Sequence, residues 1–66
     1  MSLRYRRCVA LYDCEADQND ELSFKAGEII AVINEETNDD EWMEGVIENE
    51  PSRRGLFPAI FVDFLI

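Results

Sequence analysis

No stretch of this 66-residue chain repeats apolar residues at the roughly 3.6-residue period of an amphipathic helix, whereas short apolar runs recur between clusters of turn-forming residues. The clearest run is residues 29–33, which are β-branched except for Ala31 and suit a strand with Ile30 and Val32 on one face. Other strand-like segments are expected at residues 8–12, 41–48, 54–57 and 62–66, and residues 22–24 are expected to form a strand edge after the charged loop. About five short strands joined by turns predict one small all-β barrel or sandwich.

Residues 13–21 separate two apolar alternations and hold five acids, which are Asp13, Glu15, Asp17, Asp20 and Glu21. Such a segment is too polar to pack in a core and too long for a simple hairpin turn. Because long structured loops in compact domains often carry function, we interpret it as a recognition surface of acids beside an aromatic residue.

Three other segments have turn or loop chemistry. Residues 25–28 include Gly27, which can take the positive φ of a chain reversal. Residues 34–40 form a polar loop, and residues 48–53 are expected to be a turn because Pro51 cannot donate to a central ladder.

The charge of the chain is strongly negative, at -9, and the acids are concentrated. Residues 13–50 contain fourteen acids and a single base, Lys25. A surface of this sign repels phosphate, which excludes nucleic acid and anionic membranes as partners and favours a basic peptide.

An enzymatic function is excluded by the residue types available. The chain has no histidine, and no nucleophile is paired with a base. Asp17, Asn19, Glu21 and Glu28 have the spacing of calcium ligands, but Leu22 occupies the position where the sharp turn of such a loop needs glycine. We therefore predict a non-catalytic domain without metal or cofactor.

The two cysteines, Cys8 and Cys14, do not make a disulfide framework and are predicted to be reduced thiols. The chain has no signal-like segment and no apolar run long enough to span a membrane, so a cytoplasmic location is expected. Residues 1–6 are interpreted as an N-terminal extension, with Met1-Ser2-Leu3 as an addition to the natural sequence, and residues 7–66 as a single domain.

Five motifs occur in a diagnostic order: Ala10-Leu11-Tyr12-Asp13-Cys14, then Asp20 to Phe24, Lys25 to Glu28, Trp42 with Gly45, and Gly55 to Val62. In this order and spacing the chain resembles a Src homology 3 (SH3) domain. The resemblance implies a five-stranded barrel of two orthogonal antiparallel sheets, with a 3₁₀ turn near residues 59–61. The core is then expected to contain Ala10, Leu22, Phe24, Ile30, Val32, Phe57 and Val62, with Cys8 beside them.

The family resemblance also implies a peptide groove that accepts a polyproline helix, lined here by Tyr12, Cys14, Trp42, Pro58 and Phe61. Asp17, Asp20 and Glu21 match family positions that hold an arginine or lysine of the ligand, and Glu41 extends their field together with Glu35, Glu36, Asp39 and Asp40. The expected partner is a proline-rich, basic segment of another protein. The domain is expected to be a monomer that acts as an adaptor in a larger signalling or cytoskeletal protein, which could recruit it to a membrane.

Three residues depart from the family pattern. Cys14 replaces a tyrosine, Ile60 an asparagine that hydrogen-bonds the ligand, and Phe61 the last tyrosine. Cys14, Phe61 and the turn at residues 51–55 are similar to the C-terminal module of Arf GTPase-activating proteins with BAR, PH and ankyrin domains. The loss of polar anchors leaves an alternative open, in which the apolar surface of Cys14, Trp42, Ile60 and Phe61 dimerises or docks another folded domain.

Overall fold

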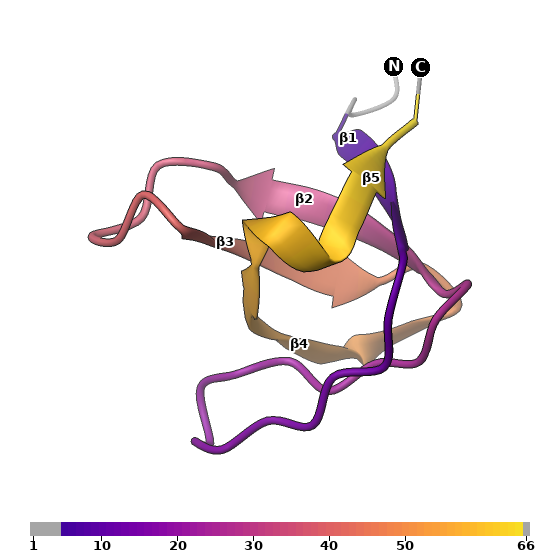
Figure 1. The fold of residues 1–66 in the computed structure, drawn as a ribbon, viewed down its shortest axis with the longest axis horizontal. Helices are drawn as coiled ribbons and strands as arrows, with labels where there is room; N and C mark the ends of the chain where they lie inside the picture. Colours follow the sequence, from indigo (N-terminus) through magenta and orange to yellow (C-terminus); the bar gives the residue numbers. More distant parts are fainter. Residues whose placement is uncertain (1–4, 66) are drawn as a thin grey trace.

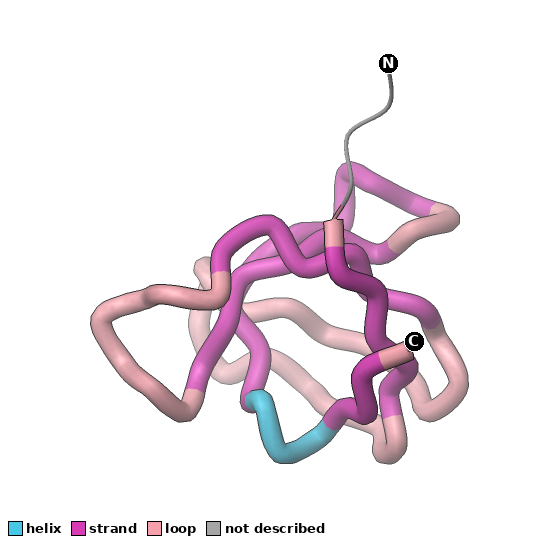
Figure 2. Tube along the Cα trace, turned by 90° about the horizontal axis from the view of Figure 1, so that it is seen from above, coloured by secondary structure: helices cyan, strands magenta, loops and turns pink. Residues whose placement is uncertain are grey.

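The five strands of the computed structural model, which describes residues 5–65, hydrogen-bond in the order β4-β3-β2-β1-β5, and each pairing is antiparallel (Figure 1). The elements are β1 (Arg6–Ala10), β2 (Ile29–Asn34), β3 (Trp42–Ile47), β4 (Glu50–Pro58), the 3₁₀ helix η1 (Ala59–Phe61) and β5 (Val62–Phe64). Figure 2 shows the ladder bending round on itself, so the two predicted sheets are parts of one continuous curved sheet. The predicted five-stranded all-β fold is confirmed.

The inner face of this curved sheet forms the core. All eight residues expected there are buried, including Cys8, Ile30 and Phe57, which are fully excluded from solvent. Phe24, from the long loop, packs edge-on against Phe57 with ring centroids 6.4 Å apart. Met43 and Ile47 are also buried, because alternation along β3 turns them inward with Gly45.

The segment at residues 48–53 differs from the prediction of a turn. Only Glu48 and Asn49 form the turn, and β4 already begins at Glu50. Pro51 is tolerated because β4 is an edge strand and because the register shifts there: Val46 faces Arg54, whereas Ile47 faces Glu50.

The predicted element ends also need adjustment. The last strand ends at Phe64 rather than Ile66, and residue 66 lies outside the described residues, as do residues 1–4 of the predicted extension. Strand β1 begins at Arg6, and it ends at Ala10, so that Tyr12 lies in the following loop. None of the helical segments in residues 5–65 has the length and apolar character needed to cross a bilayer.

The acidic segment folds back onto β4. Residues 14 and 24 exchange two backbone hydrogen bonds of 2.8 and 2.9 Å, which close the loop on itself. The Leu22 N–H donates to the Leu56 carbonyl at 2.7 Å, and the Leu56 N–H donates to the Asp20 carbonyl at 2.8 Å. A Cβ at Gly55 would lie 2.8 Å from the Asp20 oxygen, so glycine permits this close approach. Residues 22–24 therefore bridge to other elements instead of forming a strand.

Four arginines outside the acid-rich region neutralise part of it. Arg6, Arg7 and Arg54 each pair with one glutamate, which are Glu35, Glu48 and Glu44 respectively, and Arg53 pairs with both Glu28 and Glu50. The Arg53 fork is the most extensive of these contacts, with Nη1 3.0 Å and Nη2 2.8 Å from the two Glu28 carboxylate oxygens, and Nη2 donating to the Ser23 carbonyl at 3.0 Å. It joins β4 to the turn before β2.

Replacing Arg53 with methionine is expected to lower the free energy of unfolding by about 1–2 kcal/mol, because a partly buried bidentate pair is lost and the Glu28 carboxylate keeps only its bond from the Lys25 N–H. Chemical denaturation at pH 7 measures this change. Arg7→Met is the matched control: its pair with Glu48 is exposed, so its loss should lower the unfolding free energy less than the loss of the Arg53 pair does. Equal losses in the two variants would contradict a special role for Arg53.

The same ion pair predicts a dependence of stability on pH. Hydrogen bonds from Arg53, and then from the Lys25 backbone, lower the pKa of Glu28 below its usual 4.5. A carboxyl group whose pKa is lowered by folding adds stability above the pKa of the unfolded chain, and this stability is lost as pH falls through the folded value. The unfolding free energy should therefore drop below about pH 4.5, and the drop should be smaller in Arg53→Met. If the unfolding free energies of the two proteins fell equally with decreasing pH, the Arg53–Glu28 pair would not be the cause of the drop.

Candidate functional site

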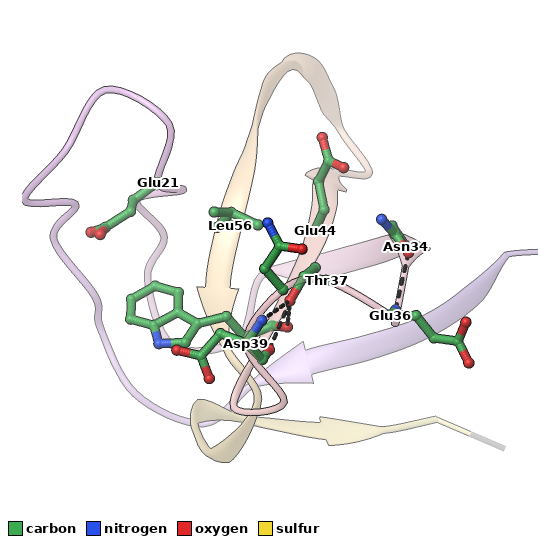
Figure 3. A pocket seen from close by; sticks show the side chains of 9 residues that line it. Glu21, Asn34, Glu36, Thr37, Asp39, Glu44 and Leu56 are labelled. Atoms are coloured by element: carbon green, nitrogen blue, oxygen red, sulfur yellow. Dashed lines mark hydrogen bonds between the residues drawn. The ribbon is translucent and has the colours of Figure 1, made fainter.

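A cavity of about 570 Å³ opens between the long acidic loop and the loop that joins β2 to β3 (Figure 3). Its lining is contributed by both loops, by the end of β2 and by the outer faces of β3 and β4. The residues are Glu21, Asn34, Glu36, Thr37, Asn38, Asp39, Trp42, Glu44 and Leu56. We refer to this cavity as the acidic pocket.

Trp42 stands at the start of β3, opposite Pro58 in the β3–β4 ladder. The backbone N–H of Trp42 donates to the Asp39 carbonyl at 3.0 Å, and this bond fixes the backbone where the loop meets β3. Its side chain is half-buried and does not belong to the core. The indole therefore forms a wall of the acidic pocket while remaining accessible.

The loop beside Trp42 is held by short side-chain contacts. The Thr37 hydroxyl lies 2.7 Å from the carbonyl oxygens of both Asp39 and Trp42 (Figure 3). Asn34 Oδ1 accepts from the Glu36 N–H, and Asp39 Oδ1 accepts from the Glu41 N–H, each at 3.0 Å. These contacts order the backbone from which the acidic side chains project.

The lining of the acidic pocket carries four carboxylates and no cation, since Glu21, Glu36, Asp39 and Glu44 are its ionisable members. Glu21 Oε1 accepts the Asp17 N–H at 3.0 Å. Within the part of the chain that the structure describes, the arginine pairs occupy five of the fourteen acids of residues 13–50. The nine acids left without such a pair all lie in residues 13–21 and 36–41, the two loops that flank the pocket. Three of these nine acids, Glu21, Glu36 and Asp39, line the acidic pocket together with Trp42. Asp13 and Glu15 line the smaller cavity on the other side of the long loop.

A second feature, an exposed aromatic surface, adjoins η1. Tyr12 is 58% exposed, and its ring meets that of Phe61 edge-on with centroids 5.7 Å apart. The Leu11 N–H donates to the Phe61 carbonyl at 2.8 Å, which ties the start of the acidic loop to η1. Ile60, on the same turn, is 78% exposed. The result is an apolar surface with one phenolic hydroxyl.

Cys14 is half-buried and packs against the core. It also lines a smaller cavity of about 200 Å³ with Phe24 and Arg53. Burial, followed by the charges of Glu21 and Asp17, raises the pKa of the Cys14 thiol. Cys8 is fully buried, its Sγ lies 3.6 Å from the Ile30 carbonyl oxygen, and burial raises its pKa to about 11. Both cysteines are free thiols.

The two thiols should be labelled at very different rates. Because the thiolate is the reactive form, a pKa raised from 9.0 to about 11 leaves Cys8 with roughly 100-fold less thiolate at pH 8, in addition to its complete burial. Iodoacetamide labelling followed by mass spectrometry should modify Cys14 first, more slowly than a cysteine in an unfolded peptide. A Cys14 that stays unreactive until denaturant is added would count against its place in an accessible groove.

The structure places the predicted site residues in four groups, one of which is Cys14 alone, against the core and in the smaller cavity and not in the acidic pocket. Glu21 and Trp42 line the acidic pocket, with Pro58 beside Trp42, while Tyr12 and Phe61 form the aromatic pair. Asp17, Asp20 and Glu41 are exposed or loop residues outside the pocket lining, and their hydrogen bonds use backbone atoms. The sequence reading missed Asn34, Thr37, Asn38, Glu44 and Leu56. Glu44 was detectable, because a residue two positions after Trp42 in a strand lies on the same face.

The model of one family, described as the variant SH3 domain, matches residues 10–63. The chain belongs to the SH3 domain family. SH3 domains are non-catalytic protein-interaction modules.

Curated relatives contain this domain as a small part. Human SH3 domain-containing protein 19 is 43% identical over 60 residues, which cover 91% of this chain and 7% of that protein. Chicken endophilin-A1 is 41% identical over 59 residues, 89% of this chain and 15% of the relative. This SH3 domain therefore spans well under a fifth of the length of these relatives.

Solved SH3 domains have the same architecture over the full chain. The C-terminal SH3 domain of Entamoeba histolytica myosin IB, crystallised with a peptide from EhFP10(GEF), has a TM-score of 0.81 and 30% identity, and the alignment covers 100% of both chains. The yeast Nbp2p SH3 domain in complex with a peptide from Ste20p has a TM-score of 0.82 and 30% identity, covering 100% of this chain and 94% of that chain.

Proposed function

We propose that this SH3 domain binds proline-rich peptide segments that carry arginine or lysine. The observation that carries the proposal is the distribution of charge: among the acids of residues 13–50, the ion pairs leave unpaired only those of the two loops that flank the pocket, and three of these line it beside Trp42. A guanidinium or ammonium group that enters the acidic pocket beside Trp42 would meet Glu21 from one loop and Asp39 from the other (Figure 3). Such complementarity steers basic segments to this face and disfavours acidic ones.

The proline part of the ligand is assigned to the aromatic surface. A polyproline II helix is rigid and has no internal hydrogen bonds, so it loses little entropy on docking against aromatic walls. Tyr12 and Phe61 would form one wall, and Trp42 with Pro58 the next. The Trp42 indole N–H can donate to a ligand carbonyl. Two related SH3 domains have been solved with a bound peptide, which supports peptide binding as the function.

The three departures from the family pattern make the acidic pocket more important. Cys14, Ile60 and Phe61 remove two phenolic hydroxyls and one amide from the groove, and Ile60 adds an exposed apolar side chain. A proline-rich ligand without a basic residue then has few polar anchors. We infer that most of the selectivity comes from the basic residue of the ligand.

We also propose a role for the domain within its parent protein. As one module of a longer cytoplasmic protein, the domain would act as a monomeric adaptor that joins its parent to proline-rich partners in signalling or cytoskeletal assemblies. The resemblance of Cys14, Phe61 and residues 51–55 to the C-terminal module of Arf GTPase-activating proteins remains part of this proposal, whereas the relatives named above are of other kinds. The sequence of the parent protein upstream of this domain tests it directly.

Calorimetric titration with synthetic peptides tests the proposed function. Peptides with the core Pro-Pro-Leu-Pro-Pro, with one flanking arginine or with alanine in its place, keep the proline content constant. We expect dissociation constants on the order of 1 to 100 μM for the arginine peptides, since a shallow groove buries little area. The alanine peptides should bind at least about fivefold more weakly. Equal affinities for the arginine and the alanine peptides would show that the acidic pocket takes no part in peptide recognition.

A second candidate function is self-association through the apolar surface, which the 78% exposure of Ile60 favours. In that case Ile60, Phe61, Cys14 and Trp42 would form an interface between two copies. Sedimentation at micromolar and at hundred-micromolar concentration distinguishes the candidates. Because a net charge of -9 repels a second copy, self-association should strengthen with salt, whereas binding of a basic peptide should weaken.

A further inference from the structure

One carboxylate of the acidic pocket is already paired with a cation of the domain itself. Glu44 Oε2 lies 3.2 Å from Arg54 Nη2. Over residues 5–65, Glu21, Glu36 and Asp39, the other acids of the lining, have no arginine or lysine within ion-pair distance. Arg54 therefore compensates one of four pocket acids.

The strand register explains this pairing. Glu44 lies opposite Leu56 and Arg54 lies opposite Val46, so Glu44 and Arg54 are diagonal neighbours on the outer face of β3 and β4. Long side chains reach across such a diagonal. The Arg54 side chain is 59% exposed and does not line the pocket, whereas Glu44 is 32% exposed. The guanidinium thus contacts the pocket acid from outside.

The Glu44 side chain extends toward Arg54, with which it forms the ion pair. In Figure 3 its carboxylate lies at the end of the pocket away from the Trp42 indole, while Glu21 projects on the indole side. A cation of the ligand could bind Glu44 only if Glu44 separated from Arg54. The loss of the Arg54–Glu44 ion pair would then offset part of the binding free energy gained. Glu21 and Asp39, which lie on the indole side in Figure 3, remain available without this cost, whereas Glu36 projects from the opposite side of the pocket.

We propose that Arg54 is a specificity-determining residue, which holds Glu44 away from the ligand, so that the β3 side of the acidic pocket offers no free carboxylate to a second basic side chain. The inference rests on the proposed function, because it concerns the same pocket. Without Arg54, Glu44 becomes a second anchor at the far end of the cavity. The pocket then distinguishes peptides with two basic residues from peptides with one.

Two pairs of synthetic peptides with the core Pro-Pro-Leu-Pro-Pro test the inference. In each pair one peptide carries a single arginine and the other carries two arginines separated by alanine, and the pairs place these residues before or after the core. Arg54→Gln should bind the two-arginine peptide roughly two- to fivefold more tightly than the unmodified domain does, the range expected for one exposed ion pair. Its affinity for the one-arginine peptide should change no more than that of Arg7→Gln.

Arg7→Gln is the matched control because it removes the same charge from an exposed arginine whose partner, Glu48, does not line the pocket. Adding Glu44→Gln to Arg54→Gln should abolish the gain for the two-arginine peptide. Equal tightening of both peptides, or no tightening, would overturn the role of Arg54 and leave the proposed function standing. Failure of every peptide to bind the unmodified domain would overturn the proposed function, and this inference with it.

Discussion

Replacing Trp42 with alanine is expected to weaken binding of an arginine-containing proline-rich peptide by at least about thirtyfold, or roughly 2 kcal/mol, since central aromatic residues of this kind dominate binding energies. The indole contributes to both parts of the site, because it lines the acidic pocket and stands opposite Pro58 in the β3–β4 ladder. Calorimetric titration of the variant measures the loss.

The fold should survive this change, because the side chain lies outside the core and the contacts of Thr37 and Asp39 with residue 42 use only its backbone. We expect the unfolding free energy to fall by less than about 1 kcal/mol, as for changes outside packed cores. Thermal unfolding of the same sample supplies this control. A melting temperature that collapses together with binding would show that Trp42 supports the fold instead of the ligand.

Gly45→Ala should produce the largest loss of stability. A Cβ at this position would lie 2.6 Å from Ile30 Cγ2, 2.8 Å from the Ala31 carbonyl oxygen and 2.9 Å from Phe57 Cε1. Neither Ile30 nor Phe57 can move freely, because both are fully buried. Overpacking of this kind costs about 3 kcal/mol, which in a domain of this size lowers the melting temperature by roughly 12–24 °C.

Gly27→Ala is the matched control, since the two substitutions add the same methyl group. Gly27 has a φ of +94°, and a Cβ at this position would have no atom within 4 Å, so the cost of the substitution is only the backbone strain, about 1–2 kcal/mol. Thermal unfolding of both variants should show the larger loss for Gly45→Ala. A larger loss at Gly27 would mean that the β3 contacts relax more easily than the turn.

The core and the strands could largely be predicted because both depend on local pattern. The alternation of Ile30 and Val32 identified the inner face of β2, and Phe24 and Phe57 were correctly placed in the core. Met43 and Ile47 were missed, although the same alternation runs through β3, because acids surround Trp42 in the sequence and obscure the apolar face.

The beginning of β4 could not be predicted, because it depends on position in the sheet. Pro51 argues against a central strand, and only the strand order shows that β4 lies at an edge where proline is tolerated. The register shift beside Ile47 accommodates the residues that looked like a turn. Such information is absent from a single sequence.

The acidic pocket could be predicted only in part from the sequence. The excess of acids and the position of Trp42 indicated an acidic site, and Glu21 does line it. The arginine pairs could not be foreseen, since they join residues as far apart in sequence as Arg7 and Glu48. Those pairs decide which acids remain available, and so they separate Glu28 and Glu50 from the acids of the two loops.

The central claim is that the uncompensated acids beside Trp42 hold a basic residue of the ligand. The most direct measurement is the affinity of the one-arginine peptide for Glu21→Lys and Asp63→Lys, titrated from low salt to about 0.5 M, where the Debye length falls to a few ångströms. Both substitutions change the charge by two, but Asp63 lies on β5, exposed and outside the pocket lining. Glu50 would be a poor control, because its removal breaks the pair with Arg53.

We predict that Glu21→Lys weakens binding about tenfold or more at low salt and removes most of its salt dependence, since a lysine in the pocket repels the ligand cation at close range. Asp63→Lys should weaken binding less than about threefold, through the screened long-range field alone. Equal losses in the two variants, or binding that is indifferent to salt in the unmodified domain, would contradict the account.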